Sequence, residues 1–312
     1  MKRTIVVGML VGAAGFSMTV GADQTPQPAG INVPDIQRVK DNLYLIGGSD
    51  PREAGSFTGG NTAVFVTDTG VVVVDTKWPG WGRMILEKIR SVTDKPVTMI
   101  VNSHTHADHS GSNIEFPATV EFVAHERTRA NMAKATCEPV ANCQSFKGEN
   151  QKYLPKKTFK DKLTLLSGKD QIDLYHFGRG HTNGDSLIVF TALRTMHTGD
   201  LYQLKWLPFI DPASGGSGVA FPDTLAKAVA TIPNVDTIIP GHSPVSTWSD
   251  FKEHAELLKE FRMTVETGIK AGKSVDEIAS AYKIPAKYKG YSTDAERVKA
   301  NVKMIVDELK KK

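Results

Sequence analysis

The hydrophobic and polar positions of the chain alternate with two different periods, which predict its strands and helices. A period of two, or a short apolar run, predicts strands in the first half of the chain at 36–46, 62–66, 71–75, 97–102 and 120–124. The turn at 67–70 joins two of these strands as a hairpin. Helices are predicted over 81–92, where Met84, Ile85 and Ile89 have helical spacing, and over 125–135.

The second half of the chain repeats this order of elements. Strands are predicted in a hairpin at 163–177, and at 186–191, 194–198 and 235–239. Helices are predicted at 221–231, 251–271, 274–282 and 294–310. Residues 136–158 have little periodicity and are interpreted as a surface insertion, and residues 203–218 form an irregular loop rich in Gly, Pro and aromatic residues. This order suits two sheets packed together with helices outside, in a single domain at 35–312 that ends in helices.

The amino-terminal residues do not belong to this pattern. An apolar core follows Lys2 and Arg3 and ends in small residues at 20–22, so residues 1–22 are predicted to be a signal peptide. Residues 23–34 contain three prolines and are interpreted as a linker. We therefore expect a periplasmic or secreted protein without stable membrane insertion after cleavage. An uncleaved anchor is the alternative, although the apolar core is shorter than the roughly 20 residues of a membrane span.

Composition and charge narrow the class of protein. The chain is 40% hydrophobic and 23% charged, as is typical of a folded globular protein, and its net charge of +4 gives no case for a nucleic-acid partner. Its two cysteines, Cys137 and Cys143, are predicted to form a disulfide because the protein is expected to be exported. A metal-binding pair is disfavoured, since zinc sites prefer closer spacing.

One strand end concentrates side chains that bind metals. His104, His106, Asp108 and His109 follow directly after the apolar run 97–102. Residues two apart in an extended chain point the same way, so His104 and His106 can reach one ion, and a turn can offer Asp108 and His109 to a second. Imidazole and carboxylate suit zinc and its first-row neighbours. Further candidates follow later strands, namely His181, Asp200 and His242.

Four motifs resemble those of the metallo-β-lactamase superfamily in identity and order. They are His-x-His-x-Asp-His at 104–109, Gly-His-Thr-x-Gly-Asp at 180–185, Thr-Gly-Asp at 198–200 and Pro-Gly-His at 240–242. The resemblance, which covers about residues 61–244, implies a four-layer αββα sandwich of two mixed sheets with a two-metal site between them. It further implies that His104, His106 and His181 hold one ion, that Asp108, His109 and His242 hold the other, and that Asp200 bridges them.

The resemblance also implies an activity. It predicts an exported hydrolase with two Zn²⁺, or another first-row divalent metal, in which a metal-bound hydroxide oriented by Asp108 attacks an ester, lactone or amide. Hydrolysis of β-lactams is an alternative, although the β-lactamases that share the first three motifs usually carry cysteine or serine in place of Asp200. A mono-iron sulfur dioxygenase on the same fold and a non-catalytic zinc-binding protein are further alternatives. The expected partner is a small-molecule substrate, and the oligomeric state is left open.

Cationic, amide and aromatic residues flank the predicted ligands. Those predicted to contact substrate are Arg179, Asn183, Tyr202, Lys205 and Trp206, with Phe209 beside them. Packing of the loop on the sandwich is an equally supported interpretation of its aromatic residues. His197, three residues before Asp200, could orient a ligand, but a strand histidine bonded to backbone is the favoured interpretation.

Overall fold

The computed structural model describes residues 34–137 and 143–311. The predicted signal peptide lies outside the described residues, and so does the predicted linker apart from Pro34. Among the helices of the described ranges, none combines the length and the apolar character needed to cross a membrane.

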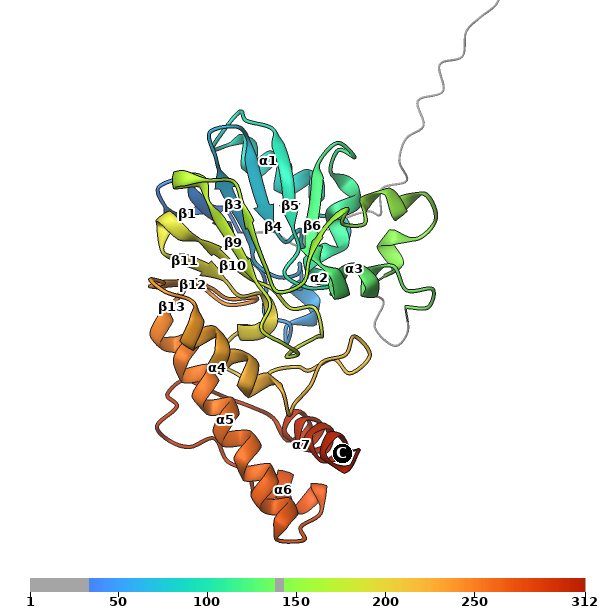
Figure 1. Cartoon of the computed structure of the whole chain (residues 1–312), viewed down its shortest axis with the longest axis vertical. Helices are drawn as coiled ribbons and strands as arrows, with labels where there is room; N and C mark the ends of the chain where they lie inside the picture. Colours follow the sequence, from blue (N-terminus) through green and yellow to red (C-terminus); the bar gives the residue numbers. More distant parts are fainter. Residues whose placement is uncertain (1–33, 138–142, 312) are drawn as a thin grey trace, which may run out of the picture.

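Two mixed β-sheets lie face to face at the centre of the molecule (Figure 1). The first sheet keeps the sequence order, antiparallel from β1 to β4 and parallel from β4 to β7. Its strands are β1 (Ile36–Lys40), β2 (Leu43–Ile46), β3 (Thr62–Val66), β4 (Val71–Val74), β5 (Val97–Val101), β6 (Glu121–His125) and β7 (Lys157–Phe159).

The second sheet has the order β13-β12-β11-β10-β9-β8 and is antiparallel except between β11 and β12. Its strands are β8 (Lys162–Leu165), β9 (Ile172–Tyr175), β10 (Leu187–Phe190), β11 (Thr195–His197), β12 (Thr237–Ile239) and β13 (Ser246–Thr247).

Alternating side chains divide the core between the layers. On β3, Ala63 and Phe65 face the second sheet, where the Phe65 ring lies 5.0 Å from that of Phe190, while Val64 faces outward. All four valines of β4 are buried, since helices cover the outer face of this sheet. Continuous apolar runs in these strands therefore follow from burial on both faces.

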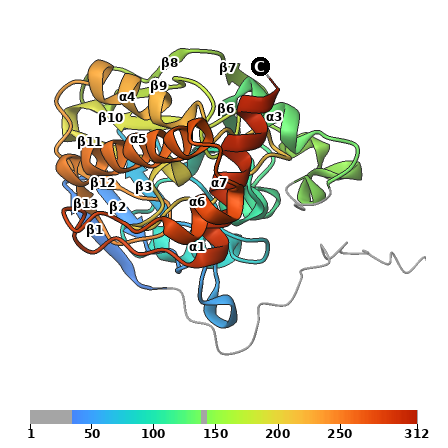
Figure 2. The same cartoon turned by 90° about the horizontal axis from the view of Figure 1, so that it is seen from below.

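Helices form the two outer layers of the sandwich, which confirms the predicted αββα architecture. Helix α1 (Gly82–Arg90) covers the first sheet with Ile85 and Ile89, and α4 (Phe221–Thr231) and α5 (Trp248–Lys270) cover the second. Helices α6 (Val275–Ala281) and α7 (Ala295–Lys310) lie beside α5 (Figure 2). The remaining short helices are α2 (Ala107–Ser110) and α3 (Glu126–Met132), with 3-10 turns at Ala54–Ser56, Gly111–Glu115, Gln144–Phe146, Gly148–Tyr153, Gly168–Asp170, Thr191–Leu193 and Gly199–Tyr202.

Several predicted boundaries were wrong. The single strand expected at 36–46 is two antiparallel strands, β1 and β2, joined by a turn at Asp41 and Asn42. The turn was missed because both strands share one alternating pattern of hydrophobic and polar residues. The helix expected at 125–135 ends at Met132, and the strand expected at 235–239 begins at Thr237. Helix α2 and strand β13 were not predicted.

The segment at 136–158 is only partly irregular. It contains two of the 3-10 helices, and its last residues begin β7 at the edge of the first sheet. The predicted disulfide between Cys137 and Cys143 is present.

Candidate metal centre

The seven predicted ligands meet at one edge of the sandwich. They lie in loops and turns that follow the carboxyl ends of strands: residues 104–109 after β5, Asp200 after β11, and His242 after β12, with His181 in the loop after β9. Strands that run the same way end at the same edge of a sheet, so residues far apart in sequence meet there. The described residues contain two groups that could each hold a metal ion, and together these groups comprise all seven residues.

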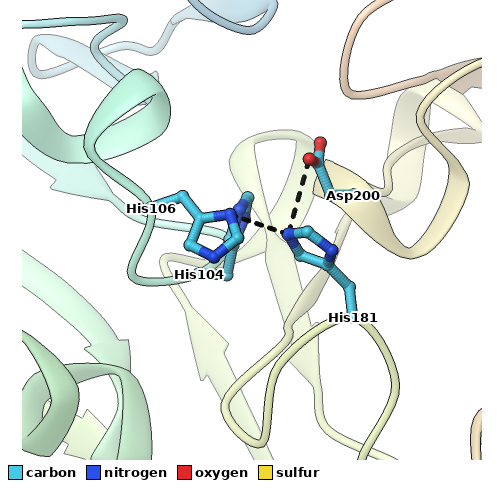
Figure 3. A group of neighbouring side chains, drawn as sticks. All are labelled: His104, His106, His181 and Asp200. Carbon is cyan, nitrogen blue, oxygen red and sulfur yellow. Dashed lines mark hydrogen bonds and ion pairs between the residues drawn. The ribbon is translucent and has the colours of Figure 1, made fainter. Parts of the chain in front are cut away.

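The first group combines His104, His106, His181 and Asp200 (Figure 3). His106 Nδ1 lies 2.9 Å from His181 Nε2, which in turn lies 3.5 Å from Asp200 Oδ2. All four residues are buried, and one ligand atom from each lies within 4.8 Å of the others.

The second group combines Asp108, His109 and His242. His109 Nε2 lies 3.1 Å from His242 Nε2, and Asp108 Oδ2 lies 3.2 Å from His242 Nε2. Asp200 Oδ1 approaches this group too, at 3.2 Å from His109 Nε2, while Asp200 Oδ2 faces the first group. The Asp200 carboxylate therefore lies between the two groups, where a bridging ligand would have to be.

Each histidine uses its other ring nitrogen to bond a fixed group of the protein. The partners are Ser103 Oγ for His104 at 3.0 Å, Asp211 Oδ2 for His106 at 2.9 Å, Asp75 Oδ2 for His109 at 2.7 Å, the Phe209 carbonyl for His181 at 2.7 Å and the Ser49 carbonyl for His242 at 3.0 Å. Carboxylates and carbonyls only accept, so in the last four pairs the bonded nitrogen carries a proton, and the other nitrogen has a lone pair whenever the imidazole is neutral. Such outer partners orient metal-binding histidines.

The free lone pairs fit a pair of metal ions. His104 Nε2 is buried without a hydrogen-bond partner, and the nitrogens of His106 and His181 face each other at 2.9 Å. Burial lowers the pKa of His181 to about 4 and that of His104 well below its usual value, so both imidazoles are neutral, as metal binding requires. A cation between them would satisfy atoms that nothing else in the described protein satisfies.

Carboxylates dominate the electrostatics of the second group. Burial alone would lower the pKa of His242, but Asp200 and Asp108 raise it to about 9. Burial would raise the pKa of Asp108, but His109 and His242 lower it to about 2. The carboxylates thus draw protons onto these imidazoles, in the place where a metal ion would carry the positive charge.

Close backbone packing holds the ligands in position. A Cβ atom at Gly60 would lie 2.2 Å from a ring carbon of His109, so no larger residue fits there without displacing the ligand. Lys77 is fully buried and donates to the carbonyls of Gly47 and Gly60 at 2.7 Å each. Asp75 and Lys77 both have positive φ, 61° and 64°, a conformation that non-glycine residues keep only where surrounding contacts enforce it.

Three of these supporting residues were missed by the sequence reasoning: Asp75, Lys77 and Asp211. Asp75 directly follows the apolar strand β4, and that position is the one local signal of a site residue. His197 was interpreted correctly as bonded to backbone, since its Nε2 contacts the Asn61 carbonyl and its Nδ1 accepts the Gly199 amide.

The five predicted substrate contacts lie in different surroundings. Tyr202 is buried against His254, and Lys205 forms ion pairs with Asp250 and Glu253. The guanidinium groups of Arg52 and Arg297 lie 5.2 and 4.7 Å from the centroid of the Trp206 ring. Arg179 and Asn183 line a separate cavity. Their roles in substrate binding stay predictions.

Other aromatic residues are closer to the ligands. The Phe57 ring stacks on His242 with centroids 5.8 Å apart and contacts Trp78, which is 44% exposed. On the other side, the Phe209 ring lies 6.0 Å from that of His106. Apolar surface therefore flanks both metal-binding groups.

Comparison with known proteins agrees with this geometry. The sequence model of the Metallo-beta-lactamase superfamily matches residues 55–242. A metallo-beta-lactamase type 2 of Elizabethkingia meningoseptica is 24% identical over 73% of this chain and 86% of its own length. The 2,4-dinitroanisole O-demethylase subunit alpha of Nocardioides sp. (strain JS1661) is 25% identical over 69% of this chain and 62% of its own length.

Solved structures share the fold. A metallo-beta-lactamase from Pontibacter korlensis has a TM-score of 0.59 at 21% identity and covers 72% of this chain and 98% of its own. A structure of TMB-1 has a TM-score of 0.59 at 15% identity, and the match covers 73% of this chain and 99% of TMB-1. The family match spans more than half of the residues and includes all seven candidate ligands, so this chain belongs to the metallo-β-lactamase superfamily.

Proposed function

We propose that this protein is an exported hydrolase that uses two zinc ions, or another first-row divalent metal, to cleave a small ester, lactone or amide. One observation carries the proposal: five histidines, each oriented through its other ring nitrogen, direct their free nitrogens at two adjacent points, with Asp200 between them. Two adjacent divalent ions supply an activated water and Lewis acidity toward a carbonyl oxygen.

Among the candidate ligands, Asp108 is the one best placed to contact the attacking water. Its side chain is 14% exposed, whereas no other candidate ligand is more than 8% exposed. The Asp108 side chain is therefore the most accessible of the candidate ligands, and its lowered pKa keeps it ionised at neutral pH. We assign it the orientation of the attacking water and the acceptance of its proton.

The aromatic residues at the opening favour a substrate with an apolar body. Phe57 stacks on His242 and contacts Trp78, and Phe209 lies beside His106 and His181. An acyl or aryl group packed between them would place its carbonyl over the metal centre, and apolar contacts of this kind stabilise binding by about 25 cal/mol per Å² buried.

β-Lactam hydrolysis is the second candidate. It is favoured by the relative from Elizabethkingia, which is a metallo-beta-lactamase and of which this chain covers 86%. The O-demethylase relative adds an aryl methyl ether, 2,4-dinitroanisole, to the compounds worth testing.

The test is metal quantification followed by a substrate panel. We expect two zinc ions per chain, loss of activity on chelation, recovery with zinc, and turnover of aryl esters or lactones. Turnover of a chromogenic cephalosporin alone would select the β-lactamase alternative, and one iron per chain in place of zinc would select the mono-iron sulfur dioxygenase. A two-zinc protein that hydrolyses no compound of the panel would refute the hydrolase. Sequencing the mature amino terminus tests export, with Asp23 as the expected first residue.

A further inference from the structure

A cavity of about 490 Å³ lies apart from the candidate metal centre. It is lined by Arg127, His176, Gly178, Arg179, Asn183 and Gly215, none of which is a candidate metal ligand. Arg127 is the second residue of α3, and the other lining residues come from the loop around His181 and from the irregular loop at 203–218.

Two hydrogen-bonded segments separate this cavity from the metal centre. The Asn183 amide donates to the Ser214 carbonyl at 3.0 Å, and the Asp211 amide donates to the His181 carbonyl at 2.9 Å. The side chains of His181 and Asp211 belong to the metal centre, whereas Asn183 lines the cavity. The two sites therefore share one wall but not their lining side chains.

The side chains around the cavity offer donors and positive charge. Arg179 is held in place because it donates to the carbonyls of Gly215 and Gly216 at 2.7 and 2.8 Å, and its Nη1 group remains available. Asn183 accepts from Asn131 through its oxygen, which leaves its amide nitrogen as a donor. Within the described residues, neither Arg127 nor Arg179 forms an ion pair with a carboxylate.

The positive charge of Arg127 acts on His176, another residue that lines the cavity. His176 donates through Nδ1 to the Asp185 carbonyl at 2.8 Å. Burial lowers the pKa of His176, and against the effect of that carbonyl the nearby Arg127 lowers it further. Arg127 therefore lies close enough to this cavity for its positive charge to act on a lining residue, against the opposite effect of the Asp161 and Glu126 carboxylates.

We propose that this cavity binds the oxyanion group, a carboxylate or a phosphate, of a small molecule. Two guanidinium groups without carboxylate partners can donate hydrogen bonds to the oxygen atoms of such a group, each of which accepts more than one bond. The cavity is larger than a carboxylate or phosphate, so it has room for the rest of the small molecule. The anion has two sources: the distal end of the hydrolysed substrate, or an independent ligand. The first source rests on the proposed hydrolase function, and the second does not.

Titration of the zinc-loaded protein with inorganic phosphate, followed by two-dimensional amide NMR, tests the site. We expect saturable shifts of the Gly178 and Gly215 amides, and a Kd at least tenfold weaker in Arg127→Gln, since one charge-assisted contact is lost. The matched control is Arg90→Gln, which removes another exposed arginine, at the end of α1. Absence of shifts at these amides, or the same Kd in Arg127→Gln and the wild type, would overturn the proposal.

Kinetics then separate the two sources. For two hydrolysed esters that differ only in a carboxylate or a carboxamide tail, a tenfold rise in KM confined to the carboxylate in Arg127→Gln identifies the substrate as the ligand. Unchanged KM values, together with weakened phosphate binding, identify an independent anion. If no ester is hydrolysed, the proposed function fails while the phosphate titration still decides the anion site.

Discussion

Replacing Asp211 by asparagine tests whether an outer partner sets the metal affinity of this centre. Asp211 Oδ2 accepts the Nε2 proton of His106 at 2.9 Å, and both residues are buried. Because this bond places the proton on Nε2, it leaves the Nδ1 lone pair directed at His181 and the first metal position. Asparagine keeps the shape of the side chain but removes its negative charge.

The size of the effect follows from that single bond. Loss of an outer carboxylate partner typically weakens metal binding 10- to 100-fold, which corresponds to about 1.4 to 2.7 kcal/mol. The bond from the Ala213 amide to Asp211 Oδ1 at 2.8 Å can be kept by the asparagine oxygen, so the loop at 203–218 should retain its conformation. We therefore expect weaker zinc binding without loss of folding.

Competition with a chromogenic chelator measures this directly. In Asp211→Asn, the dissociation constant of at least one of the two zinc ions should rise at least tenfold. In the control Asp236→Asn, whose carboxylate is 45% exposed and pairs with Arg194, both dissociation constants should stay unchanged. Matching thermal melts of the zinc-saturated proteins confirm that folding is intact. A zinc Kd within twofold of the wild-type value would refute the view that Asp211 orients His106.

Three further perturbations have expected outcomes. Asp108→Asn should retain zinc, measured by metal analysis, but lose at least a hundredfold in kcat, because its amide cannot accept a proton; full activity would exclude Asp108 from proton transfer. Reducing the Cys137–Cys143 disulfide should lower the free energy of unfolding by about 2 kcal/mol while kcat stays constant, and parallel melts and assays with and without reductant decide this. Asp250→Asn should destabilise the protein by about 1 kcal/mol at pH 7, because the Asp250 carboxylate accepts from the backbone amide of Thr247, the N-cap of α5, and pairs with Lys205 at 2.8 Å. Burial raises the pKa of Asp250, but these contacts hold it below its usual value of 3.8, so this stabilisation exists above pH 4 and is lost as the pH falls through the lowered pKa; a difference in melting temperature that did not shrink toward pH 3 would contradict the assignment.

The sequence by itself determined the layers and the ligand candidates. The strands and outer helices follow from local periodicity, as in the four valines of β4 and the spacing of Ile85 and Ile89 on α1. The cluster from His104 to His109 can be recognised in the sequence because its residues are neighbours in the chain. A strand followed by a turn also restricts the positions that these side chains can take. The hairpin of β1 and β2 was predicted as one strand, because a continuous alternation of hydrophobic and polar residues does not reveal a turn within it.

Only the tertiary structure decided which groups orient the ligands and what lies behind them. Asp75 and Asp211 reach His109 and His106 across 34 and 105 residues, and such pairings leave no periodic trace in the sequence. The same holds for the cavity that brings Arg127 to Arg179, two residues whose surroundings depend on how separate loops pack. Periodicity records which face of an element is buried, whereas the partner of a polar side chain depends on the approach of distant segments, and that approach is set by the packing of the whole sandwich.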